Sequence, residues 1–178
     1  CAIFQEADAF RWVSRTAYRT CELGKHRPGA GFGGERAVWE EDPAWQGFRE
    51  LFERTLVAYD WDEHLIALGL VAKPALDEAY VRQLGAAARA NGDALLAMLN
   101  DAQLRDVERA RRWNAALVRH ALAHDGNAKI VVVVLAVWVP LGERAIDAFC
   151  AALPDGAAAA GDAKAATRAF RSGIGCAL

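Results

Sequence analysis

Apolar residues recur every three or four positions along most of the chain, which is the spacing of one face of an α-helix. The pattern is strongest from Tyr59 to Tyr80, where apolar positions cover much of a helical circumference. Asp60 and Asp62 stand at its start, and their carboxylates can accept hydrogen bonds from the unpaired N–H groups of a first turn. We therefore predict a buried helix that begins here and kinks at Pro74, where proline removes a backbone donor.

The same spacing predicts further helices on both sides of this stretch. One amphipathic helix precedes Gly24, and another starts at Asp42 and Pro43, a capping side chain followed by proline at the first helical position. Residues 81–126 form either one long helix or two helices that separate near Asn91. The whole chain therefore reads as an all-α protein.

Residues 129–153 are harder to assign, because the run from Val131 to Val134 resembles a β-strand. Four valines cost about 2 kcal/mol relative to alanine in a helix, and burial of the same side chains can exceed this amount. We predict a buried helix that kinks or restarts at Pro140. Residues 1–154 are then the helical domain, and the alanine-rich residues 155–178 are a loosely held helix or a partly disordered tail.

The hydrophobic content is sufficient for a large core, and the distribution of charges argues against some classes of binding partner. The chain has 178 residues, of which 54% are hydrophobic, and its formal net charge is -2 from 21 basic and 23 acidic residues. These charges are spread along the sequence, so we expect neither nucleic acid nor an anionic membrane as a partner. The longest apolar run, from Ile130 to Val139, is too short to cross a bilayer.

The cysteines and the first residues indicate the compartment and the state of the chain. Four cysteines occur far apart, at Cys1, Cys21, Cys150 and Cys176. Their spacing is not that of a disulfide framework, so we expect thiols in a reducing cytoplasm. A helical pattern already runs at Ile3 with no methionine before it, so we expect a chain truncated at the N-terminus.

Histidine spacing bears on whether a helical bundle could hold two metal ions, because such a site needs a Glu-x-x-His pair on each of two helices. The residues three positions before the four histidines are Leu23, Trp61, Leu117 and Ala121. No such pair exists in the sequence. His120 and His124 lie one turn apart and could bind zinc with a third ligand, but ordinary surface or capping roles are favoured.

Two other groups resemble functional motifs. Helix-start chemistry accounts for an apparent acid and base cluster at Asp60, Asp62, Glu63 and His64. The glycines at 29, 31 and 34 match the spacing of a dinucleotide-binding turn, but a helix rather than a strand precedes them, and a flexible connector is favoured. We predict no catalytic, cofactor-binding or metal-binding residue in this chain.

Several surface features leave two interpretations open. A basic stripe of Arg11, Arg15 and Arg19 is either solvated or in contact with acidic helices of a partner. The charged residues from 105 to 112 are predicted to form a solvated face. Trp39 and Trp45 are core residues on the usual interpretation, although tryptophan also anchors protein interfaces.

Six segments together resemble one family. They are FQEADAFRWVSRTAYRT at 4–20, DPAWQGFRELFERTLVAYDW at 42–61, LVAKPALDEAY at 70–80, NGDALLAML at 91–99, RRWNAALVR at 111–119 and WVPLGERAIDAFCAALP at 138–154. The family is the β subunit of the hydroxylase component of bacterial multicomponent monooxygenases, in the toluene, phenol and alkene branch. The resemblance covers the C-terminal half of the family subunit.

The resemblance implies a ferritin-like helical bundle, of the type found in the small subunit of ribonucleotide reductase, that is incomplete at its N-terminus. It implies a non-catalytic subunit that scaffolds a di-iron α subunit in an α2β2γ2 assembly. By the same resemblance the complex hydroxylates aromatic or alkene substrates with O2 and electrons from NADH, which arrive through a reductase, and a small effector protein takes part.

Two alternatives of other classes remain. The first is a metal-binding, ferritin-like oxidase that acts alone. The second is a stand-alone helical oligomer that buries its exposed helix faces against copies of itself.

Overall fold

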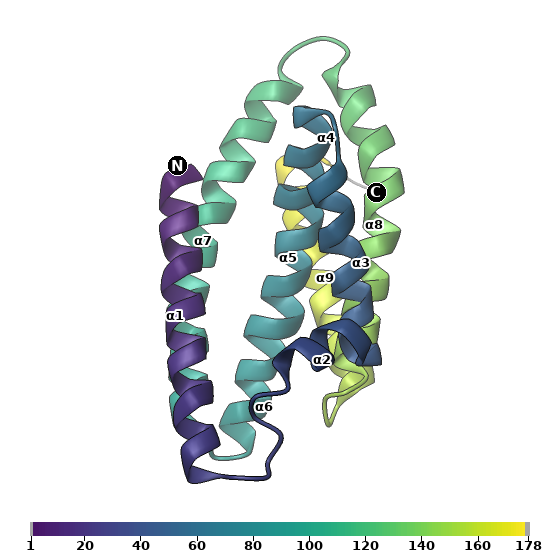
Figure 1. Cartoon of the computed structure of the whole chain (residues 1–178). Coiled ribbons are helices and arrows are strands. Elements are labelled where there is room, and N and C mark those ends of the chain that lie inside the picture. Colours follow the sequence, from purple (N-terminus) through teal and green to yellow (C-terminus); the bar gives the residue numbers. More distant parts are fainter. Residues whose placement is uncertain (1, 177–178) are drawn as a thin grey trace.

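The computed structural model describes residues 2–176 and consists of helices joined by short connections (Figure 1). Their bounds are α1 Ala2–His26, α2 Glu35–Glu41, α3 Pro43–Val57, α4 Trp61–Ile66, η1 Ala67–Ala72, α5 Lys73–Leu76, η2 Asp77–Gln83, α6 Leu84–Ala90, α7 Ala94–Leu122, α8 Asn127–Cys150 and α9 Gly156–Ile174. Elements η1 and η2 are π-helical, and no β-strand occurs between residues 2 and 176. The predicted all-α fold is confirmed.

A single helical rod, from α4 through α6, runs through the middle of the molecule (Figure 1). It begins at Trp61, as predicted, although Asp60 accepts no capping hydrogen bond through its side chain. Pro74 lies within the rod, which continues as π-helical segments on either side of α5. The N–H of Lys73 donates to the carbonyl of Leu68, five residues back, so the hydrogen-bond register widens immediately before the proline.

The core lies between this rod, α3, α8 and α9. Asp42 caps α3 by accepting a hydrogen bond from the N–H of Ala44 at 2.9 Å, which confirms the predicted start. Aromatic rings from α3, η2 and α8 meet in the core, with ring centroids 5.1 Å apart for Trp45 and Phe149 and 5.6 Å apart for Trp45 and Tyr80. Trp45 and Trp39 are both partly buried and pack against the core.

The ambiguous valine run is helical, but it is only partly buried. Helix α8 continues through Pro140 without a break. Val131 is buried, whereas Val132 and Val133 are 46% and 65% exposed. The prediction of a helix is confirmed, and the expectation that the run is buried as a whole is wrong. One side of α8 packs on the core and the opposite side is uncovered.

The C-terminal segment is not loosely held. Helix α9 packs along α8 and buries a row of small residues, including Ala159, Ala160 and Ala163. The expectation of a loose or partly disordered end is wrong for residues 156–176, because small side chains let two helices approach closely. Residues 177 and 178 lie outside the described residues. The division of the chain at residue 154 stays a prediction.

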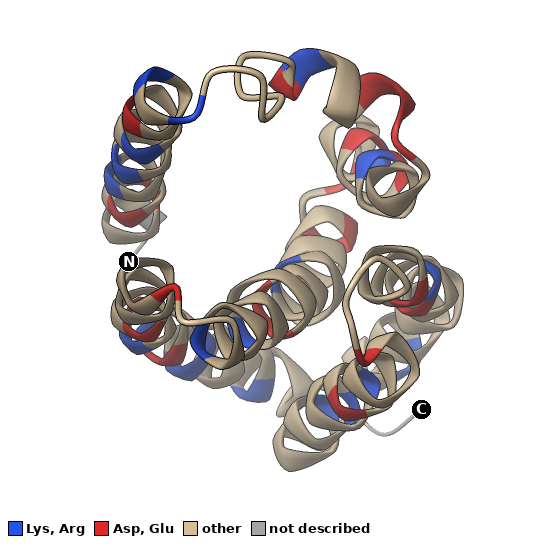
Figure 2. Cartoon of the chain, turned by 90° about the horizontal axis from the view of Figure 1, so that it is seen from below, with Lys and Arg blue, Asp and Glu red and all other residues tan. Residues whose placement is uncertain are grey.

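Helix α1 stands apart from the rest of the molecule. It lies alongside α7 (Figure 1), and between Ile3 and His26 none of its residues is buried. Viewed from below, α1 and α7 lie on one side of the central rod and α2 with α3 on the other, so the helices form an open ring (Figure 2). The chain breaks at residues 91–93 between α6 and α7, which settles the choice between one helix and two.

Candidate functional site

The residues that resembled an acid and base cluster are engaged in packing. Nδ1 of His64 lies 2.8 Å from the carbonyl oxygen of Thr55, and Glu63 accepts a hydrogen bond of 2.9 Å from Nε1 of Trp138. These contacts tie the start of the rod to α3 and α8. Glu63 and His64 therefore serve packing between helices, and Asp60, which was expected to cap the first turn, accepts no hydrogen bond there.

The remaining candidates for metal or cofactor binding also have simple local contacts. The rings of His120 and His124 meet edge to face with centroids 5.1 Å apart, and Nδ1 of His124 lies 3.0 Å from the carbonyl oxygen of His120. Across residues 2–176, no three His, Cys, Asp or Glu side chains gather as a metal site. The glycine-rich segment joins α1 to α2, so the strand that precedes a dinucleotide-binding turn is replaced by a helix.

Two buried carboxylates, which the sequence analysis missed, lie on η2. Glu78 is 1% exposed and accepts hydrogen bonds of 2.7 Å from both Arg82 and Arg111. Asp77 is 2% exposed and accepts a hydrogen bond of 3.0 Å from Lys73. Burial raises the pKa of Asp77, while the charges of Lys73 and Arg111 oppose that rise. The centre of the rod thus carries ion pairs inside an apolar bundle.

Polar side chains of α7 supply hydrogen bonds that the π-helical segments lack. Because the N–H of Lys73 is used by Leu68 and Pro74 has none, the carbonyl of Gly69 loses its helical donors. Nδ2 of Asn114 lies 3.4 Å from that carbonyl oxygen. Both Gly69 and Asn114 are buried, so the contact replaces a missing backbone hydrogen bond where water cannot.

A second asparagine of α7 makes the same kind of contact with a backbone carbonyl further along the rod. Nδ2 of Asn100 donates to the carbonyl of Val81 at 3.0 Å. A Cβ atom added at Gly85 would lie 3.0 Å from Cβ of Asn100, and one added at Gly69 would lie 3.2 Å from Nδ2 of Asn114. Each asparagine therefore packs against a glycine, and the missing side chain allows α7 to approach the rod closely.

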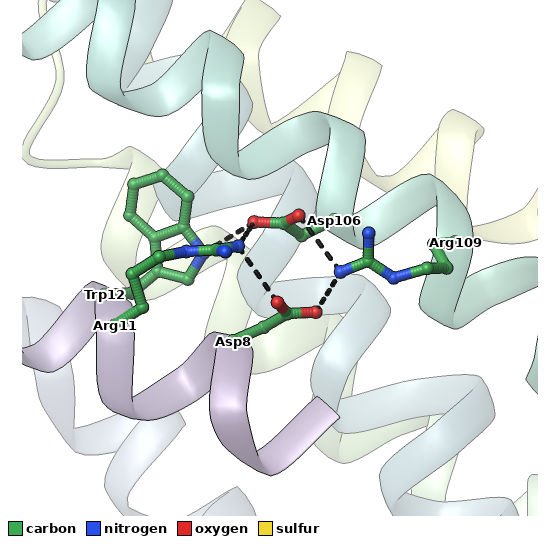
Figure 3. Close-up of polar contacts among 5 residues, drawn as sticks. All are labelled: Asp8, Arg11, Trp12, Asp106 and Arg109. Carbon is green, nitrogen blue, oxygen red and sulfur yellow. Dashed lines mark hydrogen bonds and ion pairs between the residues drawn. The ribbon is translucent and has the colours of Figure 1, made fainter. Parts of the chain in front are cut away.

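The opposite side of α7 holds α1 through an alternating ring of charges (Figure 3). Arg11 pairs with Asp8 at 2.9 Å and with Asp106 at 2.5 Å, while Arg109 pairs with Asp106 at 3.1 Å and also with Asp8. Nε1 of Trp12 donates to Asp106 at 3.0 Å. Burial alone would raise the pKa of Asp106, but the hydrogen bonds from Arg11 and Trp12 outweigh it and lower the pKa.

The basic stripe of α1 therefore faces acidic residues of the same chain. Arg19 pairs with Asp93 at the start of α7, and Arg15 lies 4.8 Å from the ring centroid of Trp12. The prediction that residues 105–112 form a solvated face is wrong for two of them. Asp106 faces α1, and Arg111 reaches inward to Glu78, because α7 is sandwiched between α1 and the rod.

Apolar side chains are uncovered in several regions of the molecule, among them α8 and the space between α1 and the rod. The first is on α8, where Ile130, Val133 and Val137 are 47%, 65% and 57% exposed. No charged residue occurs from Ile130 to Leu141. A cleft of about 170 Å³ beside this face is lined by residues that include Trp61, Leu65 and Ile130. We call Ile130, Val133 and Val137 the α8 face.

The second region lies between α1 and the rest of the bundle. Two adjacent hollows there have volumes of about 530 and 520 Å³, and both are lined by Trp12 and Gln103. Most of their surface is apolar, and Leu68, Leu76 and Tyr80 of the rod form part of it.

None of the helices described between residues 2 and 176 is long and apolar enough to span a membrane.

Comparison with known proteins gives consistent matches. The β subunit of the hydroxylase component of the toluene-4-monooxygenase system from Ectopseudomonas mendocina is 46% identical over 154 residues, which are 86% of this chain and 47% of that protein. The phenol 2-monooxygenase oxygenase component DmpL from Pseudomonas sp. (strain CF600) is 31% identical over 112 residues, 62% of this chain and 34% of that protein. The chain thus spans about half or less of the length of these relatives.

Two solved structures are similar in fold to this chain. A toluene 4-monooxygenase structure with toluene in its resting active site matches with a TM-score of 0.78 and 46% identity, over 80% of this chain and 48% of that one. A xenon-pressurised phenol hydroxylase from Pseudomonas sp. OX1 matches with a TM-score of 0.74 at 23% identity, over 93% of this chain and 49% of that one, which supports the fold alone. The predicted helical-bundle fold and family resemblance are confirmed. Residues 1–125 match the family model described as methane/phenol/alkene hydroxylase, and the chain belongs to that family.

Proposed function

We propose that this chain is part of a non-catalytic structural subunit of an aromatic or alkene monooxygenase hydroxylase. In this role it scaffolds a di-iron α subunit, which hydroxylates hydrocarbons with O2 and electrons from NADH. The observation that carries the proposal is the 46% identity, over 86% of the chain, to the β subunit of a toluene-4-monooxygenase hydroxylase component. The iron and the substrate pocket lie in the partner.

We further propose the partners and the location implied by the family resemblance. The partners are the α and γ subunits in an α2β2γ2 assembly, together with a small effector protein and a reductase. The location is the cytoplasm, where NADH is available. Cys21, Cys150 and Cys176 are free thiols, in keeping with a reducing compartment, and burial raises the pKa of Cys150 to about 11.

The chemistry of this chain supports a scaffolding role. No Glu-x-x-His pair occurs in the sequence, and the buried carboxylates Asp77 and Glu78 are paired with cations, as Glu78 is with Arg82 and Arg111. We therefore propose that no catalytic, metal-binding or cofactor-binding residue lies in this chain. Its contribution to the reaction is a rigid surface against which the catalytic subunit is positioned.

The α8 face is the surface that we assign to the α subunit. A solvent-facing helix side without charge is unusual on a monomer, and uncovered apolar patches mark interaction sites. The cleft beside Trp61 and Ile130 can accept one aliphatic or aromatic side chain, the kind of anchor that dominates interface energies. A partner with a matching apolar helix would bury Val133 and Val137.

Co-purification with a toluene-type α subunit tests the proposal. We expect the α subunit to retain the chain, either alone or joined to the rest of a family β subunit, and we expect Val133→Glu to abolish retention by placing a charge in the interface. Met98→Glu on α7 is the matched control, because Met98 is 66% exposed, close to the 65% of Val133, and lies outside the α8 face. Failure of both the chain and the completed subunit to bind would contradict the proposed function.

A further inference from the structure

A further hollow lies beside the glycine-rich connector that joins α1 to α2 along the rim of the open ring (Figure 2). Its volume is about 380 Å³. Gly29, Gly31 and Gly33 of the connector have φ angles of 89°, 85° and 103°, in the left-handed region that other residues rarely adopt. With these turns, the connector contributes Phe32 to the wall of the hollow.

Three aromatic rings from three parts of the chain line this hollow. They are Phe32 from the connector, Trp39 from α2 and Trp45 from α3. The rings of Trp39 and Trp45 have centroids 6.0 Å apart and planes inclined by 53°, so they form a corner rather than a flat stack. Trp45 packs against Phe149, and Nε2 of Gln46 donates to the carbonyl of Trp39 at 3.2 Å. These contacts hold the two indole rings in place.

Glu35, the first residue of α2, is the only charged side chain among the described residues that line the hollow. Its carboxylate accepts a hydrogen bond of 2.9 Å from the N–H of Gly33. Hydrogen bonds from the N–H groups of Gly33 and of Glu35 itself lower the pKa of this carboxyl, so it is ionised at neutral pH. The next residue, Arg36, pairs with Glu40 instead. The aromatic hollow thus carries one negative charge.

This combination of groups favours one class of ligand. The faces of aromatic rings attract cations. A metal ion would need several oxygen or nitrogen ligands, and a primary ammonium group would need acceptors for three N–H donors. Besides the carboxylate of Glu35, the side chains that line the hollow offer only the hydroxyl of Thr20 as an acceptor. A quaternary ammonium group has no N–H donor, so it loses no hydrogen bond on entering an apolar site.

We propose that this hollow binds a quaternary ammonium group, with Phe32, Trp39 and Trp45 as an aromatic cage and Glu35 as the counter-charge. Such a group is carried by free molecules such as choline and by trimethylated lysine side chains of proteins. The proposal concerns only residues of this chain, and it does not depend on the scaffolding role or on any partner subunit.

Titration of the chain with choline, followed by proton NMR of the N-methyl groups, tests the proposal. Ring currents of the cage should shift these protons upfield as the site fills. The alcohol 3,3-dimethylbutanol has the shape of choline without its charge, and it should bind about tenfold more weakly, because it lacks the attraction to the ring faces and to the carboxylate. Equal binding of the two compounds would overturn the proposal.

Variants on α2 give a second measurement. Glu35→Gln should weaken choline binding by about fivefold or more, while Glu41→Gln, the same change at the other end of α2 and outside the hollow, should have no effect. Trp39→Leu should abolish the upfield shift, and Trp61→Leu, at an exposed tryptophan outside the hollow, should leave it unchanged. Because Glu35 is exposed, its variant tests the site even if Trp39→Leu does not fold.

A comparison of choline with the amide of N-acetyl-trimethyllysine distinguishes the two sources of the ligand. Tighter binding of choline would assign the site to a free molecule, and tighter binding of the lysine derivative would assign it to a modified protein. Either result supports the cage. The absence of a saturable shift with both compounds, or equal effects of Glu35→Gln and Glu41→Gln, would overturn the proposal.

Discussion

Helix α7 binds a helix on each side, and it does so in two different ways. Toward the rod it buries its contacts, with Arg111 paired to Glu78 and two asparagines bonded to backbone carbonyls. Toward α1 it offers Asp106 and Arg109 in a ring of ion pairs, of which the arginines are about half exposed. Similar charge pairs therefore lie in two different dielectric environments on one helix.

This difference in burial determines how much each contact contributes to the stability of the fold. A buried ion pair is costly to break, because the remaining charge cannot be solvated, whereas an exposed pair is weakened by water and salt. The rod side of α7 is consequently a permanent part of the bundle. The α1 side is an attachment whose strength depends on pH and salt.

The largest effect is expected from breaking the buried pair. Arg111→Met leaves Glu78, which is 1% exposed, with Arg82 as its only close cation among the described residues. We expect the free energy of unfolding to fall by about 3 kcal/mol. Chemical denaturation measures the loss as a lower midpoint at unchanged slope.

The matched control is Arg109→Met on the opposite side of α7. Arg109 is 51% exposed and pairs with Asp8 and Asp106. We expect a change of less than about 1 kcal/mol, because exposed pairs contribute little. Equal losses for the two variants would show that burial does not distinguish the two sides.

The next effect concerns the hydrogen bonds to the π-helical segments. Asn100→Ala removes the donor to the buried carbonyl of Val81 and leaves space beside Gly85. We expect a loss of about 1–3 kcal/mol, the usual penalty for an unsatisfied buried acceptor. Hydrogen exchange should show the local effect, with faster exchange for amides of η2 than for those of α3. Unchanged exchange in η2 would contradict a role for Asn100 there.

The positions of the helices could be predicted from the sequence, since periodic apolar residues report which face of a helix is buried. Two predictions depended only on neighbouring residues: that α3 starts at Asp42 and Pro43, and that the valine run is helical. The helix was predicted to continue past Pro74, but its π-helical register could not be predicted in the same way, because the compensating donor is Asn114, 45 residues away. The kink at Pro74 stays a prediction, and the side chain that supports the π-helical register lies too far along the sequence for local rules to identify it.

The polar contacts were harder to predict for the same reason. Asp77 and Glu78 interrupt an apolar pattern, and that interruption was the available signal of a buried ion pair, but Arg111 is 33 residues away. Asp106 looked solvated because its partner Arg11 on α1 is 95 residues distant in the sequence. The alanine-rich end looked weak because composition does not reveal that α8 offers a surface on which small residues pack closely.

A smaller effect is expected at the exposed side of α7. The hydrogen bonds of Asp106 lower its pKa, so its contribution to stability is complete above the ordinary aspartate pKa of about 3.9 and is lost as the pH falls through the lower value in the folded protein. We therefore expect α1 to stay docked at pH 5 and to detach in stronger acid. High salt should also weaken docking at neutral pH, because 1 M salt shortens the screening length to about 3 Å.

Hydrogen exchange of α1 measures this directly. Raising the salt concentration from 0.05 to 1 M should increase exchange in α1 and leave the rod unchanged. Asp106→Asn should reproduce the acid effect at neutral pH, because the amide lacks the charge that Arg11 and Arg109 bind. Protection of α1 that is insensitive to both changes would mean that apolar contacts hold it, contrary to the absence of buried residues between Ile3 and His26.

The smallest effect is expected from the outer partner of Glu78. Arg82 is 48% exposed and lies one turn from Glu78 on the same segment, so Arg82→Ala should cost about 0.5 kcal/mol while Arg111 still neutralises the carboxylate. The double variant with Arg111→Met should lose more than the sum of the two single changes, because only then is Glu78 without a cation. Additive losses in such a cycle would mean that each arginine acts alone, and that the contact between α7 and the rod resembles the one with α1 after all.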